Sequence, residues 1–368
     1  MHKNTNRLFF IDAIRAWAIL MMLQGHFVDG LLDNVFRDNS NTVYTVWKYF
    51  RGITAPVFFT VSGFIFSYLL VKVPEKGWAN PRVQKGIKRG IQLIIIGYLL
   101  RLNLGGLLKG HIYPGFYLVD VLHCIGLSLL IILSVYLLTY RSKHLLFPLV
   151  LVAGTILLFT LEPVYKLYSY SFFPKALANY FTKANGSVFT VIPWVGYTLF
   201  GGFMAMLFSK FKDLKYLYHY AISICILGGV SLIFFSSGWF SYLHQLTDVT
   251  VFKSVVSNNY LYIRLGDVLI VFAVFMLLRS VLQNKTLLKI GQSTLSIYVV
   301  HFIILYGSFT GLGLYRFFHH SLTPEVVIPS AIAFMIVCTT IALFYEKHKE
   351  EITSFLSIKK LLPQKNQK

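Results

Sequence analysis

Residues 8–30 read LFFIDAIRAWAILMMLQGHFVDG, an apolar stretch long enough to cross a bilayer as a helix. It is the first of ten stretches of this kind, and the chain shows no hydrophilic domain between them. The ten predicted spans are 8–30, 44–71, 87–108, 117–138, 145–162, 188–208, 219–237, 260–282, 288–312 and 326–345. The pattern predicts an all-α, polytopic integral membrane protein.

The composition agrees with this fold class. Of the 368 residues, 56% are hydrophobic and only 13% are charged, about half the charge of an ordinary soluble domain. A water-soluble fold and a disordered chain are both excluded. The three cysteines lie inside apolar stretches without His or Cys neighbours at metal-ligand spacing, so we expect neither a disulfide framework nor a metal site.

The distribution of basic residues predicts the orientation. The chain has 34 Lys and Arg against 14 Asp and Glu. Twenty-two of the basic residues fall in the two ends and every second connection, nine fall in the other connections, and three lie within spans. By the positive-inside rule, both termini are cytoplasmic, and an even number of spans follows. The basic excess is therefore an orientation signal, and we expect no nucleic-acid partner. We divide the chain into a transmembrane domain, 1–346, and a basic cytoplasmic tail, 347–368.

The first span carries the most informative polar residues. Arg15 and His26 are 11 residues apart, and at about 100° per residue their side chains end only about 20° apart around a helix. At about 1.5 Å per residue they are separated by about 16 Å along it. Asp12 and Asp29 fall near the same stripe. Arg15 is then near the cytoplasm and His26 near the outer side, where an imidazole can take a proton from an attacking hydroxyl or amine.

A simpler interpretation of this stripe stays open. Arg15 and Asp12 are three residues apart and can form an ion pair, and His26 can hydrogen-bond another helix. Arg264 and Asp267 have the same spacing, which favours a structural pair.

Other polar residues within spans are weaker candidates. Asp120 and His123 are also three residues apart, so a local contact can orient this imidazole without catalysis. His301 fits a buried histidine that only packs or forms hydrogen bonds, and Arg51 precedes a proline that should kink its span.

Two further segments have both a structural and a functional interpretation. Ser62 and Gly63 follow an apolar run, and small residues either permit close helix packing or line a site. The segment 72–90 is the densest basic connection and includes Lys85, Lys88 and Arg89. It can hold the phosphates of a cytosolic donor or contact anionic lipid, besides setting the topology.

Several of these motifs together resemble a known family. IDAIRAWAILMMLQGH (11–26) has the Arg, ten residues, His spacing of the membrane acyltransferase type 3 superfamily, and PVFFTVSGFIFSYLL (56–70) resembles its Ser-Gly-Phe segment. VDVLHCIGLSLLI (119–131) and TVIPWVGYTLFGGFMAML (190–207) are similar to the heparan-α-glucosaminide N-acetyltransferase-like branch, and IGQSTLSIYVVHFIIL (290–305) resembles a Ser-Leu-x-x-Tyr-x-x-His segment shared by these acyltransferases.

The resemblance implies an acyltransferase that takes acyl-CoA, usually acetyl-CoA, from the cytoplasm and acylates a hydroxyl or amine of an extracytoplasmic carbohydrate. It implies that His26 is catalytic and that Arg15 belongs to the acyl-CoA channel, and we assign Arg15 to the catalytic residues as well. We also assign acyl-CoA binding to Ser62, Lys85, Lys88 and Arg89. We expect supporting roles for the remaining polar and aromatic motif residues, which are Asp12, Asp29, Asp120, His123, Trp194, Tyr298 and His301. We expect no metal.

Two other classes of protein compete with this interpretation. In a proton-coupled transporter or a flippase of a lipid-linked sugar, Arg15 and His26 would coordinate the substrate or a proton, whereas a structural scaffold would tolerate alanine along the stripe. We expect the cell membrane as the location and the outer loops 31–48, 163–187 and 238–259 as the segments that select the acceptor. The acceptor, the acyl chain, ester or amide product, direct transfer or acyl-enzyme, and the oligomeric state, a homodimer included, stay open.

Overall fold

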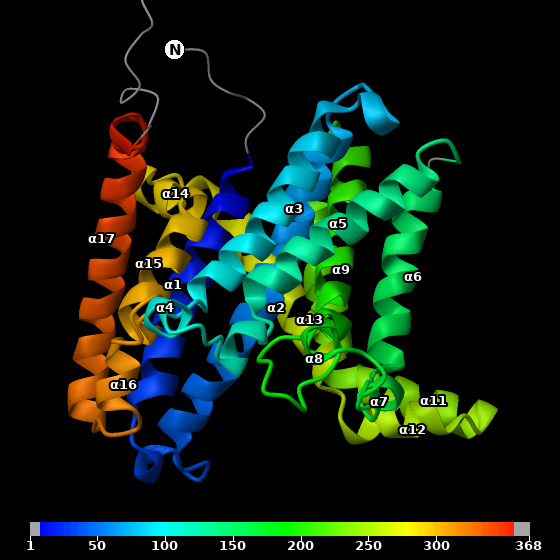
Figure 1. The fold of residues 1–368 in the computed structure, drawn as a ribbon. Coiled ribbons are helices and arrows are strands. Elements are labelled where there is room, and N and C mark those ends of the chain that lie inside the picture. Colours follow the sequence, from blue (N-terminus) through cyan, green and yellow to red (C-terminus); the bar gives the residue numbers. More distant parts are fainter. Residues whose placement is uncertain (1–7, 144, 357–368) are drawn as a thin grey trace, which may run out of the picture.

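The computed structural model describes residues 8–143 and 145–356, which form a bundle of helices joined by turns (Figure 1). Each of the ten predicted spans overlaps one of its longer helices. These are α1 (Phe9–Leu31), α2 (Thr42–Val71), α3 (Pro81–Leu100), α5 (Val121–Thr139), α6 (Leu146–Thr160), α9 (Val191–Lys210), α10 (Leu217–Val230), α13 (Tyr260–Leu277), α15 (Thr294–Tyr306) and α17 (Pro324–Leu356). The all-α class is confirmed for the described residues.

Fewer than ten helices meet a strict test for crossing a membrane. Within the described ranges, six are long and apolar enough: Thr42–Val71, Pro114–Thr139, Val191–Lys210, Leu217–Thr247, Tyr260–Ser280 and Pro324–Ile352. A seventh results if α14 (Lys285–Gln292) and α15, bent by 70° against each other, are taken as one span. α1, α3 and α6 are not among these six. α1 is continuous but carries charged residues, α3 begins with basic residues, and α6 has only 15 residues. A multi-pass membrane protein is supported, and the number ten stays a prediction.

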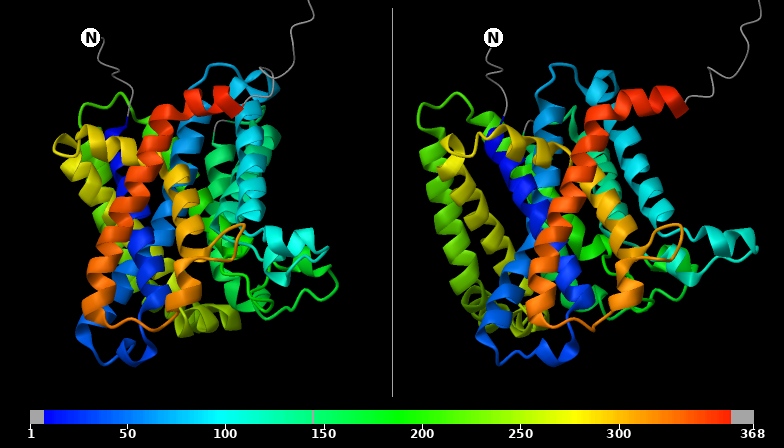
Figure 2. Two further views of the ribbon diagram at one scale, coloured as in Figure 1. Left: turned by 60° about the vertical axis from the view of Figure 1, so that its left-hand side comes forward. Right: turned by 90° about the vertical axis from the view of Figure 1, so that its left-hand side faces the viewer.

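One end of the bundle collects the basic connections. α1 begins there and α17 ends there, and the turns that lead into α3, α10 and α14 lie at the same end (Figures 1 and 2). We call it the basic end, and the other the opposite end. The arrangement agrees with the alternation of basic residues, whereas the cytoplasmic side of the membrane is assigned by the positive-inside rule alone.

Helices occupy parts of one predicted connection and of the predicted tail. α3 begins at Pro81, because the side chain of Asn80 caps its first turn and a proline fits the first helical position. Lys85, Lys88 and Arg89 therefore lie on a helix and not in a connection. α17 continues past residue 346 to Leu356, so the first part of the predicted tail is helical, while 357–368 and 1–7 lie outside the described residues.

Close packing of α2 against α9 explains the small residues of the second span. A Cβ atom on Gly63 would lie 1.9 Å from the carbonyl oxygen of Thr198, and one on Gly201 would lie 1.9 Å from that of Thr60. Each glycine thus admits the backbone of the other helix, as in other membrane bundles. The structure assigns Gly63 to helix packing.

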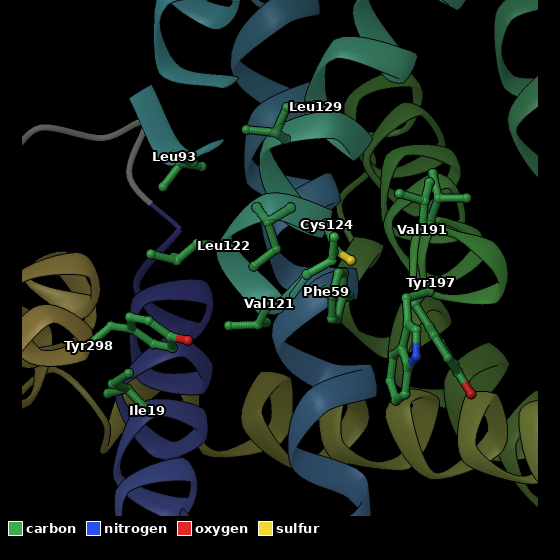
Figure 3. Packing of buried hydrophobic residues seen from close by; sticks show 14 of the residues in the cluster. Ile19, Phe59, Leu93, Val121, Leu122, Cys124, Leu129, Val191, Tyr197 and Tyr298 are labelled. Carbon is green, nitrogen blue, oxygen red and sulfur yellow. The ribbon is translucent and has the colours of Figure 1, made fainter. Parts of the chain in front are cut away.

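A hydrophobic core joins helices that are distant in sequence and holds α1 inside the bundle. Ile19 of α1, Phe59 of α2, Tyr197 of α9 and Tyr298 of α15 belong to one buried cluster, together with Val121 at the start of α5 (Figure 3). This packing fixes the rotation of α1 about its axis and therefore the direction in which its polar stripe faces. Shorter helices lie in the connections, and these are α4 (Leu104–Leu108), α7 (Glu162–Tyr165), α8 (Lys175–Ala178), α12 (Thr250–Ser257) and α16 (Leu314–Phe318). α11 (Ser236–Thr247) instead continues α10 through the π-helical stretch Ser231–Phe235 and forms the second part of the candidate span Leu217–Thr247.

Candidate active site

Arg15 lies on the half of α1 nearer the basic end and has two polar contacts. Its Nη1 atom is 3.6 Å from Oδ1 of Asp12, and its Nη2 atom donates a hydrogen bond of 3.0 Å to Oγ1 of Thr294 at the start of α15. A Cβ atom on Gly291 would lie 1.9 Å from the carbonyl oxygen of Asp12, so α14 packs directly on this turn. The ion pair that the spacing allowed is present, and Arg15 also ties α1 to α15.

His26 forms a histidine pair with His301 of α15. Nδ1 of His26 is 3.2 Å from Nε2 of His301, and the ring of Tyr306 lies 6.2 Å from the ring of His26. His301 is fully buried, and its Nδ1 has no hydrogen-bond partner among the described residues. Because Nδ1 of His26 is engaged in this pair, Nε2 is the nitrogen that is left to meet a substrate.

Two cavities meet at His26. The first, of about 300 Å³, lies between α1, α2 and α9, and we call it the α2-side cavity. Its lining residues are Met21, Met22, Gly25, His26, Arg51, Gly52, Thr54, Ala55, Phe58, Val121, Lys183, Val188, Phe189, Trp194 and Tyr260. The second, of about 590 Å³, is the α15-side cavity. Its lining residues are His26, Leu100, Arg101, Leu102, Asn103, Tyr113, Gly115, Phe116, Leu118, Asp120, Val188, Phe189, Phe302, Tyr306, Gly307, Ser308, Gly311 and Tyr315.

The two cavities reach different depths in the bundle. The α2-side cavity extends from His26 along α1 to Met21, about 7.5 Å nearer the basic end, and along α2 to Phe58. The α15-side cavity meets α3 only at its last residue and beyond, and α15 near its last turn, so it lies at the opposite end. His26, Val188 and Phe189 line both cavities.

The α2-side cavity has a basic and aromatic wall. Arg51 and Lys183 line it, and no carboxylate does among its described lining residues. Arg51 forms an ion pair with Asp29, which lies outside the lining. The ring of Trp194 packs against that of Phe189 at 4.8 Å between centroids. Positive charge and flat apolar faces therefore surround one side of His26.

A polar cluster lies next to the α2-side cavity, where Arg264 packs against the lining residue Gly52. Arg264 forms an ion pair of 2.8 Å with Asp267, and Tyr49 donates a hydrogen bond of 2.6 Å to the same carboxylate. The guanidinium of Arg264 also lies 4.3 Å from the ring centre of Tyr49. These contacts join α13 to α2 and give Arg264 and Asp267 the structural pairing that their spacing favoured.

The α15-side cavity contains an ion pair. Nη2 of Arg101 is 3.0 Å from Oδ2 of Asp120, and Nη1 donates to the carbonyl oxygen of Gly115 at 3.4 Å. Asp120 also caps α5, because its side chain accepts a hydrogen bond from Val121. Tyr298 is buried beside this pair, and its ring lies 4.8 Å from that of His301.

His123 is placed by helix packing. Its Nδ1 accepts a hydrogen bond of 3.1 Å from the backbone N–H of Asp120, which completes the cap of α5. A Cβ atom on Gly97 would lie 2.6 Å from the ring, so the imidazole fills the space opposite this glycine. His123 lines neither cavity, and its supporting role stays a prediction.

The residues assigned to acyl-CoA lie away from both cavities. Ser62 donates a hydrogen bond of 2.7 Å to the carbonyl oxygen of Phe58, one turn beyond the α2-side cavity. Lys85, Lys88 and Arg89 lie on α3 near the basic end, and Arg89 bonds Gln92 of its own helix at 3.3 Å. Their donor-binding role is not tested by these contacts.

Beyond the ends of the spans, the segment between α15 and α17 packs on the end of α1. Nε2 of His320 lies 3.2 Å from the carbonyl oxygen of Asp29. Partial burial, the charge of Arg37 and the neighbouring His319 lower the pKa of His320 below its ordinary value. The hydrogen bond to the carbonyl of Asp29 acts in the opposite direction and raises this pKa, because a carbonyl oxygen favours the protonated ring.

Some residues of the site carry no sequence signal of their own. Arg101 and Lys183 fall among the basic residues of the outer connections, and Ser308 stands in a turn. The α15-side cavity is walled by 100–118 and 306–315, whereas the acceptor loops expected from the sequence are 31–48, 163–187 and 238–259. Of those three, 163–187 supplies Lys183 to the α2-side cavity.

A family comparison decides the relationship of the chain. Residues 7–246, about 65% of the sequence, match the model of the heparan-alpha-glucosaminide N-acetyltransferase catalytic family. The chain belongs to this family. The match includes Arg15, His26 and the lining residues of the α2-side cavity from Met21 to Trp194. It ends before Tyr260, Tyr298 and His301. A comparison with curated proteins gives no match.

Membership of this family implies an acetyltransferase, and the six apolar helices make it an integral membrane protein. The resemblance to the heparan-α-glucosaminide N-acetyltransferase-like branch is thereby confirmed, whereas the segment 290–305 lies outside the matched residues.

Proposed function

We propose that this protein transfers an acetyl group from acetyl-CoA, bound from the cytoplasmic side, to a hydroxyl or amine of a carbohydrate at the outer side of the membrane. The observation that carries the proposal is the position of His26 where two cavities meet. A transferase that joins two substrates directly needs a reacting group that both of them reach. Membership of the family indicates that the transferred group is acetyl, and we assign its transfer to the junction of the two cavities.

His26 acts as the general base. Its Nδ1 faces His301 at 3.2 Å, which holds the ring and leaves Nε2 to accept the proton of the acceptor. His301 is a positioning residue, since it lines neither cavity and acts through His26. A base held in this way typically contributes about 10²–10⁴-fold to the rate.

The bond changes balance without a cofactor. Nε2 of His26 takes the proton as the acceptor oxygen or nitrogen attacks the thioester carbonyl carbon, which forms a tetrahedral intermediate. The C–S bond then breaks, and the proton passes from His26 to the departing CoA sulfur. Arg51 and Lys183 line the α2-side cavity and stabilise the negative charge that develops on the carbonyl oxygen.

The donor enters along the α2-side cavity. This cavity extends from His26 toward Met21 and Phe58, and the next turn of α2 carries Ser62. Arg15 lies on α1 about 16 Å from His26, toward the basic end. We assign the binding of the donor phosphates to the basic residues of that end, Arg15, Lys85, Lys88 and Arg89.

Acetyl transfer can be tested on membranes that contain the protein. Membranes supplied with acetyl-labelled acetyl-CoA should move the label into a carbohydrate fraction, and glycans from cells with the protein should gain the mass of one acetyl group. Label that stays in acetyl-CoA, with unchanged glycans, contradicts the proposal.

Thermal unfolding separates the transferase from a transporter. The purified protein should be stabilised by CoA through mass action, by about 2.7 kcal/mol at one hundred times the dissociation constant. A permease or flippase for a sugar has no reason to bind CoA. An unfolding midpoint that does not respond to CoA, together with uptake of a sugar into proteoliposomes, would support the transporter instead.

A further inference from the structure

A groove between α9, α10 and α13 takes no part in the proposed reaction, and we call it the α10 groove. Its volume is about 400 Å³, and it shares no lining residue with the α2-side or the α15-side cavity. Among its described lining residues none is charged, and phenylalanines such as Phe64, Phe208 and Phe272 form its buried floor. A groove of this composition suits a hydrocarbon ligand.

The α10 groove is open at the edge of the bundle. On α10, Tyr220 is 59% exposed and Ile224 is 68% exposed, and both line the groove. Only 17% of the apolar stretch in the span Leu217–Thr247 is buried within the bundle. Because the exposed apolar side chains of a membrane span face lipid, a lipid can reach the groove directly from the bilayer.

The length of the groove matches one half of a bilayer. Its lining residues run along α10 from Leu217 at the basic end to Gly228, which is about 16 Å at about 1.5 Å per residue. Along α9 they run from Phe200 to Phe211, again about 16 Å. The hydrocarbon layer of a bilayer is about 30 Å thick. The acyl chain of a lipid in the leaflet at the basic end covers about this depth, so it can lie along the whole groove.

Basic side chains lie at the end of the groove where the lipid headgroup would be. Lys210 ends α9, and Lys212 and Lys215 follow in the connection to α10, which lies at the basic end (Figure 2). The same connection supplies the lining residues Phe211 and Leu214. The three lysines are exposed and form no ion pair with a carboxylate in the described part of the chain. Their ammonium groups can therefore meet a phosphate.

Arg279 adds a fourth cation at this end. Its guanidinium lies 4.3 Å from the ring centre of Tyr218, and Nη1 donates a hydrogen bond of 2.8 Å to the carbonyl oxygen of Met276, which lines the groove. These contacts hold the guanidinium beside the groove, and its other N–H groups have no acceptor among the described residues. An arginine fork fits the oxygens of a phosphate. Asp213 is the one carboxylate of the neighbouring connection 211–216, so this end of the groove carries a net positive charge.

We propose that the α10 groove binds an anionic phospholipid from the leaflet at the basic end. One acyl chain lies along the floor at Phe64 and Phe272, and the phosphate lies between Arg279 and the lysines of the connection. An anionic headgroup is favoured over a zwitterionic one, because the cations at this end outnumber the carboxylate and basic pockets between membrane helices select acidic headgroups. The site is separate from both cavities at His26, so the proposal does not depend on the transfer reaction.

Native mass spectrometry of the purified full-length protein measures the lipids that stay bound. The probes are phosphatidylglycerol and phosphatidylcholine with the same acyl chains, and we expect phosphatidylglycerol to bind more tightly. Arg279→Gln should weaken its binding roughly fivefold, the contribution of one basic residue near a lipid surface. Arg141→Gln is the matched control, because this guanidinium also lies over a tyrosine ring at the basic end but outside the groove, and it should bind phosphatidylglycerol normally. Equal binding of the two lipids, or an Arg279→Gln protein that binds phosphatidylglycerol as the wild type does, overturns the proposal.

A second pair of variants tests the place of the acyl chain. Ala221 lines the groove, and Ala333 is an exposed alanine of α17 outside it. Ala221→Trp fills the groove and should abolish the preference for phosphatidylglycerol, whereas Ala333→Trp should keep it. If a folded Ala221→Trp protein binds phosphatidylglycerol as tightly as the wild type, the chain does not lie in the groove and the proposal is wrong.

Competition with acetyl-CoA separates this site from the donor site. Acetyl-CoA should not displace phosphatidylglycerol, because the α10 groove and the α2-side cavity share no lining residue. Displacement would make the groove part of the donor site and would overturn the lipid proposal. A protein that binds phosphatidylglycerol as described but transfers no acetyl group overturns the proposed function alone.

Discussion

Replacing His301 with alanine tests how His26 is held. The side chain of His301 is fully buried, and its Nε2 is the atom that faces Nδ1 of His26 at 3.2 Å. The ring centres lie 5.3 Å apart. Alanine removes the hydrogen bond and leaves a space beside the His26 ring, which is then free to turn away from the junction of the cavities.

The size of the effect follows from the charge on the ring. When His26 holds the proton of the acceptor it is a cation, and a hydrogen bond to a charged group is worth about 1.5–3 kcal/mol. At about 1.36 kcal/mol per factor of ten, kcat should fall roughly tenfold to a hundredfold. The KM for acetyl-CoA should change little, because His301 lines neither cavity.

The assay is steady-state transfer of acetyl label, with thermal unfolding of each variant measured in parallel. His301→Gln is the informative companion, because its amide oxygen can accept a hydrogen bond from His26 and should restore part of kcat. A purely structural role predicts that both variants lose stability and activity together. Full activity of a folded His301→Ala protein would refute the positioning role.

Three further changes test the packing and the outer end. Gly201→Ala forces a Cβ atom against a carbonyl of α2 and should destabilise the protein by about 1–3 kcal/mol in thermal unfolding, whereas Gly238→Ala, with nothing within 4 Å, should not. Asp120→Asn leaves an arginine without its partner and should lower the unfolding midpoint, and a double-mutant cycle with the arginine should show coupling. Partial burial and the charges of Arg37 and His319 lower the pKa of His320, so its packing on α1 is favoured above about pH 6.5 and loses stability as the pH falls below that value. Proteolysis of the 313–323 segment should therefore increase at low pH, and His320→Gln should remove this dependence.

The sequence predicted features that depend on periodicity along one helix. Arg15 and His26 are on one helix, as their spacing required, and the contact of Arg15 with Asp12 is local. The apolar stretches located the long helices, and Asn80 with Pro81 marks a helix start that the hydropathy pattern placed later. Hydropathy averages over a window, whereas a helix begins where its first backbone groups are capped.

The parts that could not be predicted depend on contacts between distant segments. His26 and His301 are 275 residues apart, and no periodicity links them. Arg101 and Ser308 come from different connections and meet only because α3 and α15 end beside each other. His123 stands in a motif that resembles the family, but its contacts are local. It caps α5 and packs against Gly97.

The role of His26 is tested most directly by transfer of label from acetyl-labelled acetyl-CoA, with the wild-type protein compared with His26→Ala. His319→Ala is the matched control, an exposed histidine outside both cavities. We predict that His26→Ala abolishes measurable transfer, keeps the wild-type unfolding midpoint and is still stabilised by CoA, while His319→Ala transfers label normally. Undiminished transfer by a folded His26→Ala protein would contradict the central role of this residue.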